Sequence, residues 1–184
     1  MVQLAVALSG YSTGRIWKSF PNPCPCGFLT DPRRACSCAP VQVQRYRAKI
    51  SGPLLDRIDV QIDVPAVPFQ HLSDERPHES SSAIRARVVK ARALQRARYA
   101  ADNVGCNAEL TPRLIRKYCG VDADSRRLLE LAMQRFGLSA RAYARVLKVA
   151  RTIADLGGRE RIEPPDVAEA IACRSFDRRL ERTA

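Results

Sequence analysis

The chain has 184 residues, a formal net charge of +12 and a hydrophobic fraction of 46%, enough apolar material for one ordinary domain or for a small domain plus part of another. This content argues against wholesale disorder, and no run is apolar for long enough to cross a membrane. The positive charge, mostly arginine, favours a polyanionic partner such as nucleic acid, although a solvated basic face or an acidic partner subunit would also explain it.

The N-terminal residues carry no recognisable export signal. Val2 to Leu8 is a short apolar run, but no basic segment precedes it and no clear small-residue cleavage site follows. The chain also contains seven cysteines, an odd number that does not suit a disulfide framework. We therefore expect reduced thiols and a cytoplasmic location.

The first twenty residues begin with a weak strand pattern and continue into a turn containing Gly10 and Gly14. These glycines faintly resemble a phosphate-binding loop, which requires G-x-x-x-x-G-K followed by Ser or Thr. Only three residues separate them here and Arg15 follows, so that interpretation is rejected. No other glycine fits the pattern, and no apolar run ends in Asp-Glu as a Mg²⁺-holding strand would.

Four of the cysteines form two C-x-C pairs, Cys24 with Cys26 and Cys36 with Cys38. Four thiolates can close a tetrahedral shell around Zn²⁺, and in a short loop such an ion would replace a missing apolar core. Free cysteines remain an alternative, as do two disulfides, which the expected compartment disfavours. The pattern predicts a structural zinc site, since nothing suggests a vacant coordination position.

A short helix is expected from Val41 to Lys49, and an alternating strand from Ile58 to Val64. Between them lies the motif SGPLLDRID, in which Arg57 stands between Asp56 and Asp59. From the residues alone, a local ion pair is the favoured interpretation of Arg57.

The stretch from Pro65 to Glu79 has three prolines and predicts a linker, which the domain division sets at residues 69–80. Its histidines, His71 and His78, are expected to be exposed rather than ligands.

Ser80, Ser81 and Ser82 offer caps for a helix expected over residues 83–101, which is the most basic in the chain. Its arginines either track phosphates or simply face solvent. Its narrow apolar stripe consists of Ile84, Val88, Ala91 and Leu94.

Four further helices are expected, each recognised by a capping residue or a proline at its start. They run from Thr111-Pro112 to about Cys119, from Asp122 to about Phe136 with Gly137 stopping the helix, from Ser139 to Gly157-Gly158, and from Pro164 to about Arg174. Together they predict a small α-helical bundle. The cysteines outside the two pairs are expected to be buried small apolar residues; they are Cys106, Cys119 and Cys173.

Arg141 lies in the first turn after the Ser139 cap, where a cation opposes the helix dipole. A phosphate in front of that helix end would explain the placement, because the arginine and the helix amides would both attract it. From the pattern alone, an ordinary exposed arginine is the favoured interpretation.

The run NPCPCG, the second C-x-C pair and SGPLLDRID closely resemble the magnesium-chelatase-like AAA+ ATPases of the YifB and ComM (competence-associated) family, over roughly residues 20 to 179. The resemblance implies that Asn22 is sensor 1, a polar group near the γ-phosphate of ATP. It implies that Arg57 is the arginine finger, which reaches the ATP of a neighbouring subunit. It also implies that SARAYARVLKVARTIADL is the sensor 2 helix, with Arg141 contacting ATP and Arg145 a weaker candidate.

By this resemblance the fold class is α/β plus all-α, and the chain is the C-terminal part of such an ATPase. Residues 1–19 are unmatched, 20–68 are the tail of an AAA+ α/β core with the cysteine knuckle, 69–80 are a linker, and 81–178 are a helical lid. The implied function is an ATP-driven DNA motor, a branch-migration helicase of competence and recombination that works as a hexameric ring. ATP and Mg²⁺ would be bound mainly by a missing N-terminal part, so the chain alone is not expected to hydrolyse ATP.

Two alternatives stay open. One is a non-enzymatic zinc-dependent DNA-binding module, built on the cysteine knuckle and the basic helix. The other is a subunit of a chelatase that inserts Mg²⁺ into a porphyrin, which the knuckle and the high basicity disfavour.

Overall fold

The computed structural model describes residues 3–9, 16–19, 22–29, 31, 33–49, 58–64 and 79–174. The chain divides into two compact units, the first Met1–Glu75 together with Arg174–Ala184 and the second Arg76–Cys173. Arg57, His71 and His78 lie outside the described residues, as do the turn at Gly10 and most of the expected linker. The domain boundaries expected from the sequence therefore stay a prediction.

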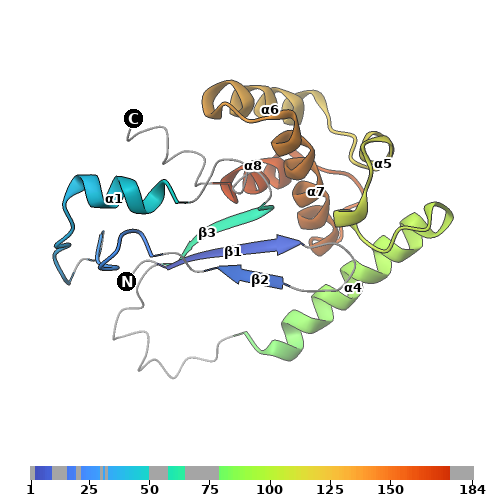
Figure 1. The fold of residues 1–184 in the computed structure, drawn as a ribbon. Coiled ribbons are helices and arrows are strands. Elements are labelled where there is room, and N and C mark those ends of the chain that lie inside the picture. The colour runs from blue at the N-terminus through green and yellow to red at the C-terminus, as the bar shows by residue number, and fades with distance from the viewer. Residues whose placement is uncertain are drawn as a thin grey trace. The chain divides into compact units, whose positions relative to one another are not determined.

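Among its described residues, the first unit holds a three-stranded antiparallel sheet in the order β2-β1-β3 (Figure 1). The strands are β1 (Gln3–Ser9), β2 (Ile16–Ser19) and β3 (Val60–Val64). Central β1 pairs Ala7 with Lys18 on one side and Ala5 with Ile62 on the other. The strand patterns recognised at the N-terminus and over residues 58–64 are thus confirmed.

The C-terminal end of the second unit leads back to this sheet. Arg174 forms a parallel bridge with Gln61 of β3, and its Nη1 donates a hydrogen bond to the carbonyl oxygen of Ile58 at 3.0 Å. Arg174 is only 2% exposed and Gln61 is fully buried. The Ile58 carbonyl therefore satisfies one donor of a buried guanidinium, which makes this return a specific contact.

The second unit is mostly helical, and every helix expected there is present. Its elements are α4 (Ser81–Tyr99), the 3₁₀ turns η1 (Ala100–Asp102) and η2 (Asn107–Glu109), α5 (Pro112–Tyr118), α6 (Ala123–Phe136), α7 (Ala140–Leu156) and α8 (Pro164–Ala172). A unit with strands followed by a helical unit agrees with the predicted class at that coarse level. None of the described helices is both long and apolar enough to cross a bilayer.

The helix boundaries follow from capping chemistry that the sequence displays. The side chains of four expected caps accept a hydrogen bond from a backbone amide three residues further on; they are Ser80, Thr111, Asp122 and Ser139. Gly137 ends α6 with a φ of 57°, in the left-handed region that a side chain disfavours. The predicted starts are therefore confirmed to within about two residues, the usual uncertainty of a helix end.

Helix α7 runs through the centre of the second unit (Figure 1). Its inward residues recur at helical spacing and belong to one buried cluster with residues of α6 and α8; α7 packs directly against α8, α4 and α5. They are Val146, Leu147, Ala150 and Ala154, with Leu129, Ala132, Val167 and Ala170 from the neighbouring helices. The amphipathic pattern read from residues 139–156 is confirmed.

The apolar stripe expected for α4 is wrong in most of its members. Ile84 and Val88 are 43% and 45% exposed, and Leu94 is 38% exposed. The helix instead buries Ala91, Gln95 and Tyr99, which lie one turn apart, because the bundle covers only its C-terminal half. Periodicity alone missed this since one member of the buried stripe is polar.

Of the three remaining cysteines only Cys119 is buried; Cys106 and Cys173 are partly exposed, contrary to expectation.

A buried carboxylate joins the elements of the helical unit. Asp155 of α7 accepts hydrogen bonds from Arg98 of α4 at 2.6 and 3.1 Å. Asn107 donates to it at 2.8 Å, Arg151 at 3.1 Å and Gln95 at 3.2 Å. Burial alone would raise the pKa of Asp155, but the hydrogen bonds from Arg98 and Asn107 outweigh it and hold the pKa below its ordinary value.

The same network reaches the loop before α8. Arg151 donates to the carbonyl oxygens of Glu160 at 2.8 Å and of Arg159 at 2.7 Å. On the other side, the Tyr99 hydroxyl donates to Asn107 at 2.5 Å. One carboxylate thereby fixes α4, η2, α7 and the α7–α8 loop relative to one another.

We expect Asp155→Ala in the full chain to lower the free energy of unfolding of the helical unit by about 3 kcal/mol, because it leaves Arg151 buried without its anion. Urea denaturation followed by far-UV circular dichroism measures this. The exposed Asp124→Asn serves as the matched control and should change stability by less than about 0.5 kcal/mol. An equal effect of the two substitutions would contradict the structural role of Asp155.

The lowered pKa of Asp155 also predicts a pH dependence. A carboxyl whose folded pKa is depressed stabilises the fold above the unfolded value, about 3.9, and that stability is lost as pH falls through the folded pKa. The acid limb of the stability curve should therefore be shallower in Asp155→Asn than in the wild-type chain. If the free energy of unfolding falls with the same slope in both chains below about pH 5, Asp155 contributes nothing to acid denaturation.

Candidate functional site

The cysteine segment folds as two tight turns that bring the C-x-C pairs together. The Gly27 amide donates to the carbonyl oxygen of Cys24 at 3.0 Å, and Gly27 has a φ of 83° that favours glycine. Further on, Asp31 Oδ1 accepts from the backbone amides of Arg33 at 2.7 Å and Arg34 at 3.1 Å. This side-chain turn reverses the chain and directs it back to the second pair.

The four cysteine Sγ atoms all lie within 4.8 Å of one another. Cys24 Sγ is 3.4 Å from that of Cys26 and 3.6 Å from that of Cys36, and Cys26 and Cys36 are 3.6 Å apart. Tetrahedral zinc with Zn–S bonds of about 2.3 Å requires sulfur–sulfur separations of about 3.8 Å. The spacing of this donor set therefore fits one tetrahedral ion.

Backbone amides support the sulfur atoms. The Leu29 amide donates to Cys24 Sγ at 3.3 Å, and the Cys26 amide donates to Cys38 Sγ at 3.4 Å. Amide donors stabilise thiolate and orient it, as groups that contact metal ligands commonly do. The same amides would hold the ligands in place around an ion.

The thiols also perturb one another electrostatically. The pKa of Cys26 is lowered to about 6, chiefly by the backbone amide of Phe28. The pKa of Cys36 is raised to about 12: the Cys38 amide lowers it, but burial and the thiols of Cys26 and Cys24 outweigh that amide. Four negative thiolates at such short distances repel, so full ionisation of the set needs a cation at its centre. The cluster therefore fits Zn²⁺ in charge as well as in geometry.

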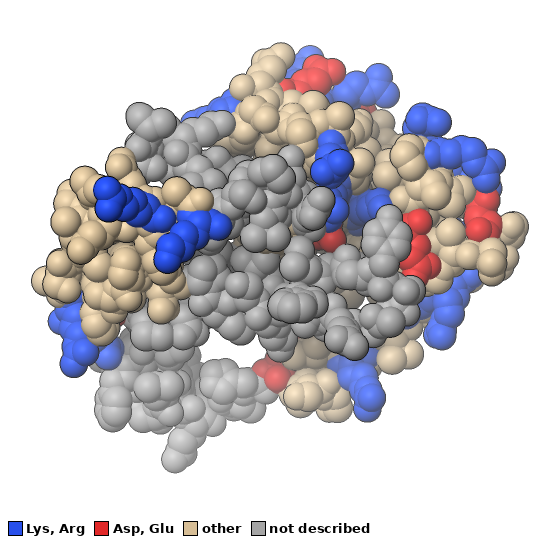
Figure 2. Space-filling model, in the orientation of Figure 1, with Lys and Arg blue, Asp and Glu red and all other residues tan. Residues whose placement is uncertain are grey.

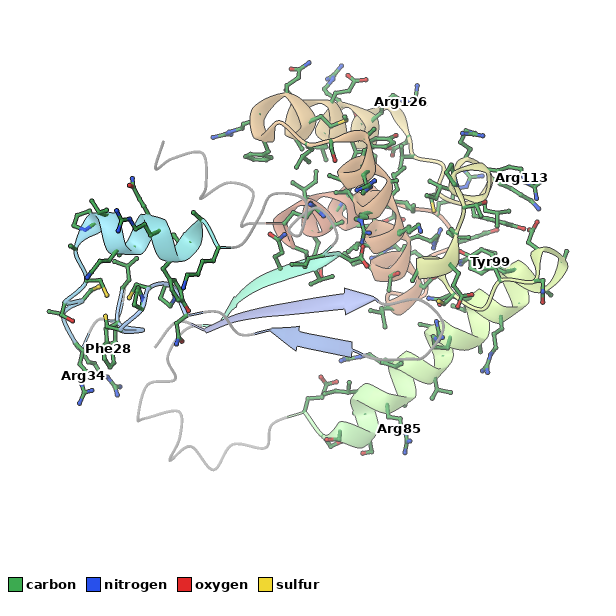
Figure 3. The ribbon with its side chains drawn as sticks, viewed as in Figure 1. Phe28, Arg34, Arg85, Tyr99, Arg113 and Arg126 are labelled. Atoms are coloured by element: carbon green, nitrogen blue, oxygen red, sulfur yellow. The ribbon has the colours of Figure 1, made fainter. Side chains whose placement is uncertain are left out.

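Helix α1 (Pro40–Arg47) follows the second pair directly and confirms the helix expected there. Gln42 Oε1 accepts from the Ala39 amide at 3.0 Å and closes its first turn. Near its end, Arg47 Nε donates to the carbonyl oxygen of Pro23 at 3.3 Å. Arg47 thus fastens the end of the helix to the loop that carries the cysteines, and Figure 3 shows α1 next to that loop.

Asn22, the expected sensor 1, lies beside the knuckle. A Cβ atom built onto Gly27 would stand 3.7 Å from Asn22 Cγ, so the amide side chain packs against the turn between the cysteines. It is half-buried. Arg57, the expected arginine finger, lies outside the described residues.

Arg141 and Arg145 belong to the other unit, in the first two turns of α7. Arg141 is exposed, and no hydrogen bond or ion pair joins it to any described residue. Arg145 is half-buried, one turn further on. Within the first unit the structure therefore brings Asn22 next to the turn between the cysteines, whereas Arg141 and Arg145 belong to the second unit.

A hollow beside the knuckle was missed by sequence reasoning. It has a volume of about 370 Å³ and is lined by Pro25, Gln42, Arg45, Tyr46 and Lys49. The i, i+3, i+4, i+7 spacing of the last four places them on one helix face. That spacing was a readable signal, but nothing in the sequence indicated that this face meets Pro25.

Two family models match the chain. Residues 78–174 match the model described as magnesium chelatase, subunit ChlI C-terminal, and residues 17–72 match magnesium chelatase, subunit ChlI. The chain is 40% identical over 162 residues to competence protein ComM of Haemophilus influenzae, covering 88% of the chain and 31% of that relative. It is 38% identical over 160 residues to the uncharacterized protein YifB of Escherichia coli, covering 86% and 30%. The chain thus spans about a third of the length of the curated relatives it matches.

We expect the purified chain to contain about one zinc ion and Cys36→Ser to lose it, because three thiolates and a hydroxyl hold Zn²⁺ far less well than four thiolates. Metal analysis by mass spectrometry measures the zinc content. Cys106→Ser, which changes a cysteine of the helical unit, is the matched control and should keep the metal. Zinc-free wild-type chain after purification in zinc-containing buffer would contradict the site.

Proposed function

The chain belongs to the family of the magnesium chelatase subunit ChlI, and from this premise we propose that it is the C-terminal part of a ring-forming AAA+ ATPase that acts on DNA. The observation that carries the proposal is the order of its parts. The segment matching the ATPase subunit ends at residue 72, and the segment matching the C-terminal domain begins at residue 78. One relative of this organisation is named a competence protein, and its name motivates DNA as the substrate.

In this proposal the first unit is the tail of the α/β core and the second is the lid. Asn22 acts as sensor 1 near the γ-phosphate. Arg57 reaches the ATP of a neighbouring subunit as the arginine finger, where its cation offsets the negative charge of the transferring phosphoryl group. The phosphate loop and the Mg²⁺ ligands come from the part of the ATPase that precedes this chain's matched segment.

The position of Arg141 supports its assignment as sensor 2. It is an exposed cation at the end of α7 where the helix dipole is also positive. Like charges at one place destabilise a free helix, and a bound phosphate removes that cost. Arg145, on the same face one turn on, is the second candidate.

The charge of α4 supports a DNA substrate. Its nineteen residues contain no aspartate or glutamate, and every residue from Ser81 to Lys90 is exposed. Figure 3 shows Arg85 projecting from this half of the helix. Only Arg87 in this exposed half has an ion pair with a described residue, Glu79 at 2.6 Å. Such a helix suits the phosphates of a polyanion.

The proposal is tested by ATP turnover of the full chain, alone and mixed with a matching half that carries the phosphate loop. We expect no turnover alone, turnover in the mixture, and a loss of at least about 1000-fold in Arg57→Ala, the lower end of what an arginine finger contributes. Arg141→Ala should weaken nucleotide binding.

The exposed Arg116→Ala is the matched control for charge and should leave turnover unchanged. A mixture that neither binds nor hydrolyses ATP would overturn the ATPase assignment for this chain. Turnover that persists in Arg57→Ala would overturn the finger while leaving the family role intact.

A further inference from the structure

The hollow beside the knuckle combines flat apolar groups with unneutralised cations. Pro25, held between two of the cysteines, forms one side, and Tyr46 belongs to the face of α1 that forms the other. Arg45 and Lys49 also line the hollow, one directly before the tyrosine in the sequence and one three residues after it, and Gln42 adds an amide. In Figure 3 the yellow sulfur atoms of the knuckle lie directly below α1.

Among the residues that the structure describes, no carboxylate forms an ion pair with the cations of this hollow. Asp31 is the only acidic residue between residues 22 and 49, and its Oδ1 is already engaged by two backbone amides of its own turn. Arg47 is turned toward the carbonyl oxygen of Pro23. The side chains of Arg45 and Lys49 form no hydrogen bond or ion pair with any residue that the structure describes. Blue side chains lie openly across the lobe that contains α1 (Figure 2).

A single-stranded nucleic acid matches this combination better than other polyanions. Its unpaired bases expose flat faces that stack on an aromatic ring, and its phosphates follow each other at short intervals beside those bases. A duplex hides the base faces, and an acidic peptide would satisfy the cations while leaving Tyr46 and Pro25 without a flat partner. The hollow is open, which suits one unit of a continuing strand.

We propose that this hollow binds one unpaired nucleotide of single-stranded DNA. The base stacks on Tyr46 against Pro25, and the flanking phosphates contact Arg45 and Lys49. The choice of DNA rests on the proposed function; the single-strand character rests on the hollow itself. The zinc ion, once bound by the four cysteines, fixes Pro25 at its place, and Arg47 fastens α1 to the same loop.

The test uses the full zinc-loaded chain and fluorescence anisotropy with a labelled strand of about 20 nucleotides, longer than a single-domain site, and with the corresponding duplex. Tyr46→Leu should weaken single-strand binding by about 5- to 100-fold, the effect of losing one base–aromatic stack. Duplex affinity should stay unchanged, because phosphate contacts of α4 do not involve Tyr46. Tyr46→Phe, which keeps the ring, should bind as the wild-type chain does.

The cations have their own readout. Substituting Arg45→Gln together with Lys49→Gln should reduce the salt slope of single-strand binding by about 1.4, since each phosphate contact contributes about 0.7. Arg126→Gln with Arg127→Gln removes the same charge from exposed positions on α6 and should leave the slope unchanged. Zinc content and circular dichroism confirm that each variant remains folded.

The outcomes separate this inference from the proposed function. A wild-type chain that binds neither form of DNA would overturn both the inference and the DNA part of the function. Wild-type binding that Tyr46→Leu and the Arg45/Lys49 variant leave intact would overturn the inference alone. Equal losses on single strand and duplex would rule out stacking. Displacement of the strand by ATP in the wild type, absent in Tyr46→Leu, would assign the hollow to a free nucleotide instead.

Discussion

The helical unit depends on the burial of one carboxylate. Asp155 has a fully buried side chain and stands between Arg98 and Arg151, so its charge can be kept inside only while both arginines stay in place. Burying an ion is costly, and the cost is offset only when geometry and hydrogen bonds are good. That requirement ties α4 to α7 and to the loop before α8 more specifically than apolar packing would. The exposed half of α4 is then free to carry its cations into solvent.

The cysteine segment obeys a related constraint, which is again set by negative charge. Here several anions would be crowded together, and the protein supplies amides but no cationic side chain close to the sulfurs among the described contacts. A metal ion is the group that resolves this repulsion. Since α1 is held to the same loop through Arg47, the placement of its cationic face follows from how the sulfurs are held.

Local signals in the sequence predicted the elements well, because capping and turn chemistry act within a few residues. Ser80, Asp122 and Ser139 marked helix starts, and Gly137 marked an end. The cysteine spacing likewise predicted the cluster. Long-range polar contacts could not be predicted, because no residue near Asp155 in the sequence indicates that its partner is Arg98, 57 positions away. The α4 stripe failed for the same reason, since Gln95 is buried only because a carboxylate from another helix accepts its hydrogen bond.

The bridge between Arg174 and Gln61 makes the helical unit an insertion in the chain rather than an appendage to it. The polypeptide leaves the first unit after β3 and returns to that same strand when α8 has ended. The helical unit is therefore joined covalently to the first unit at both of its ends, before Arg76 and after Cys173. Any reorientation of that unit has to be accommodated at both crossings, and a first unit produced without the final segment would leave the buried flank of β3 uncovered.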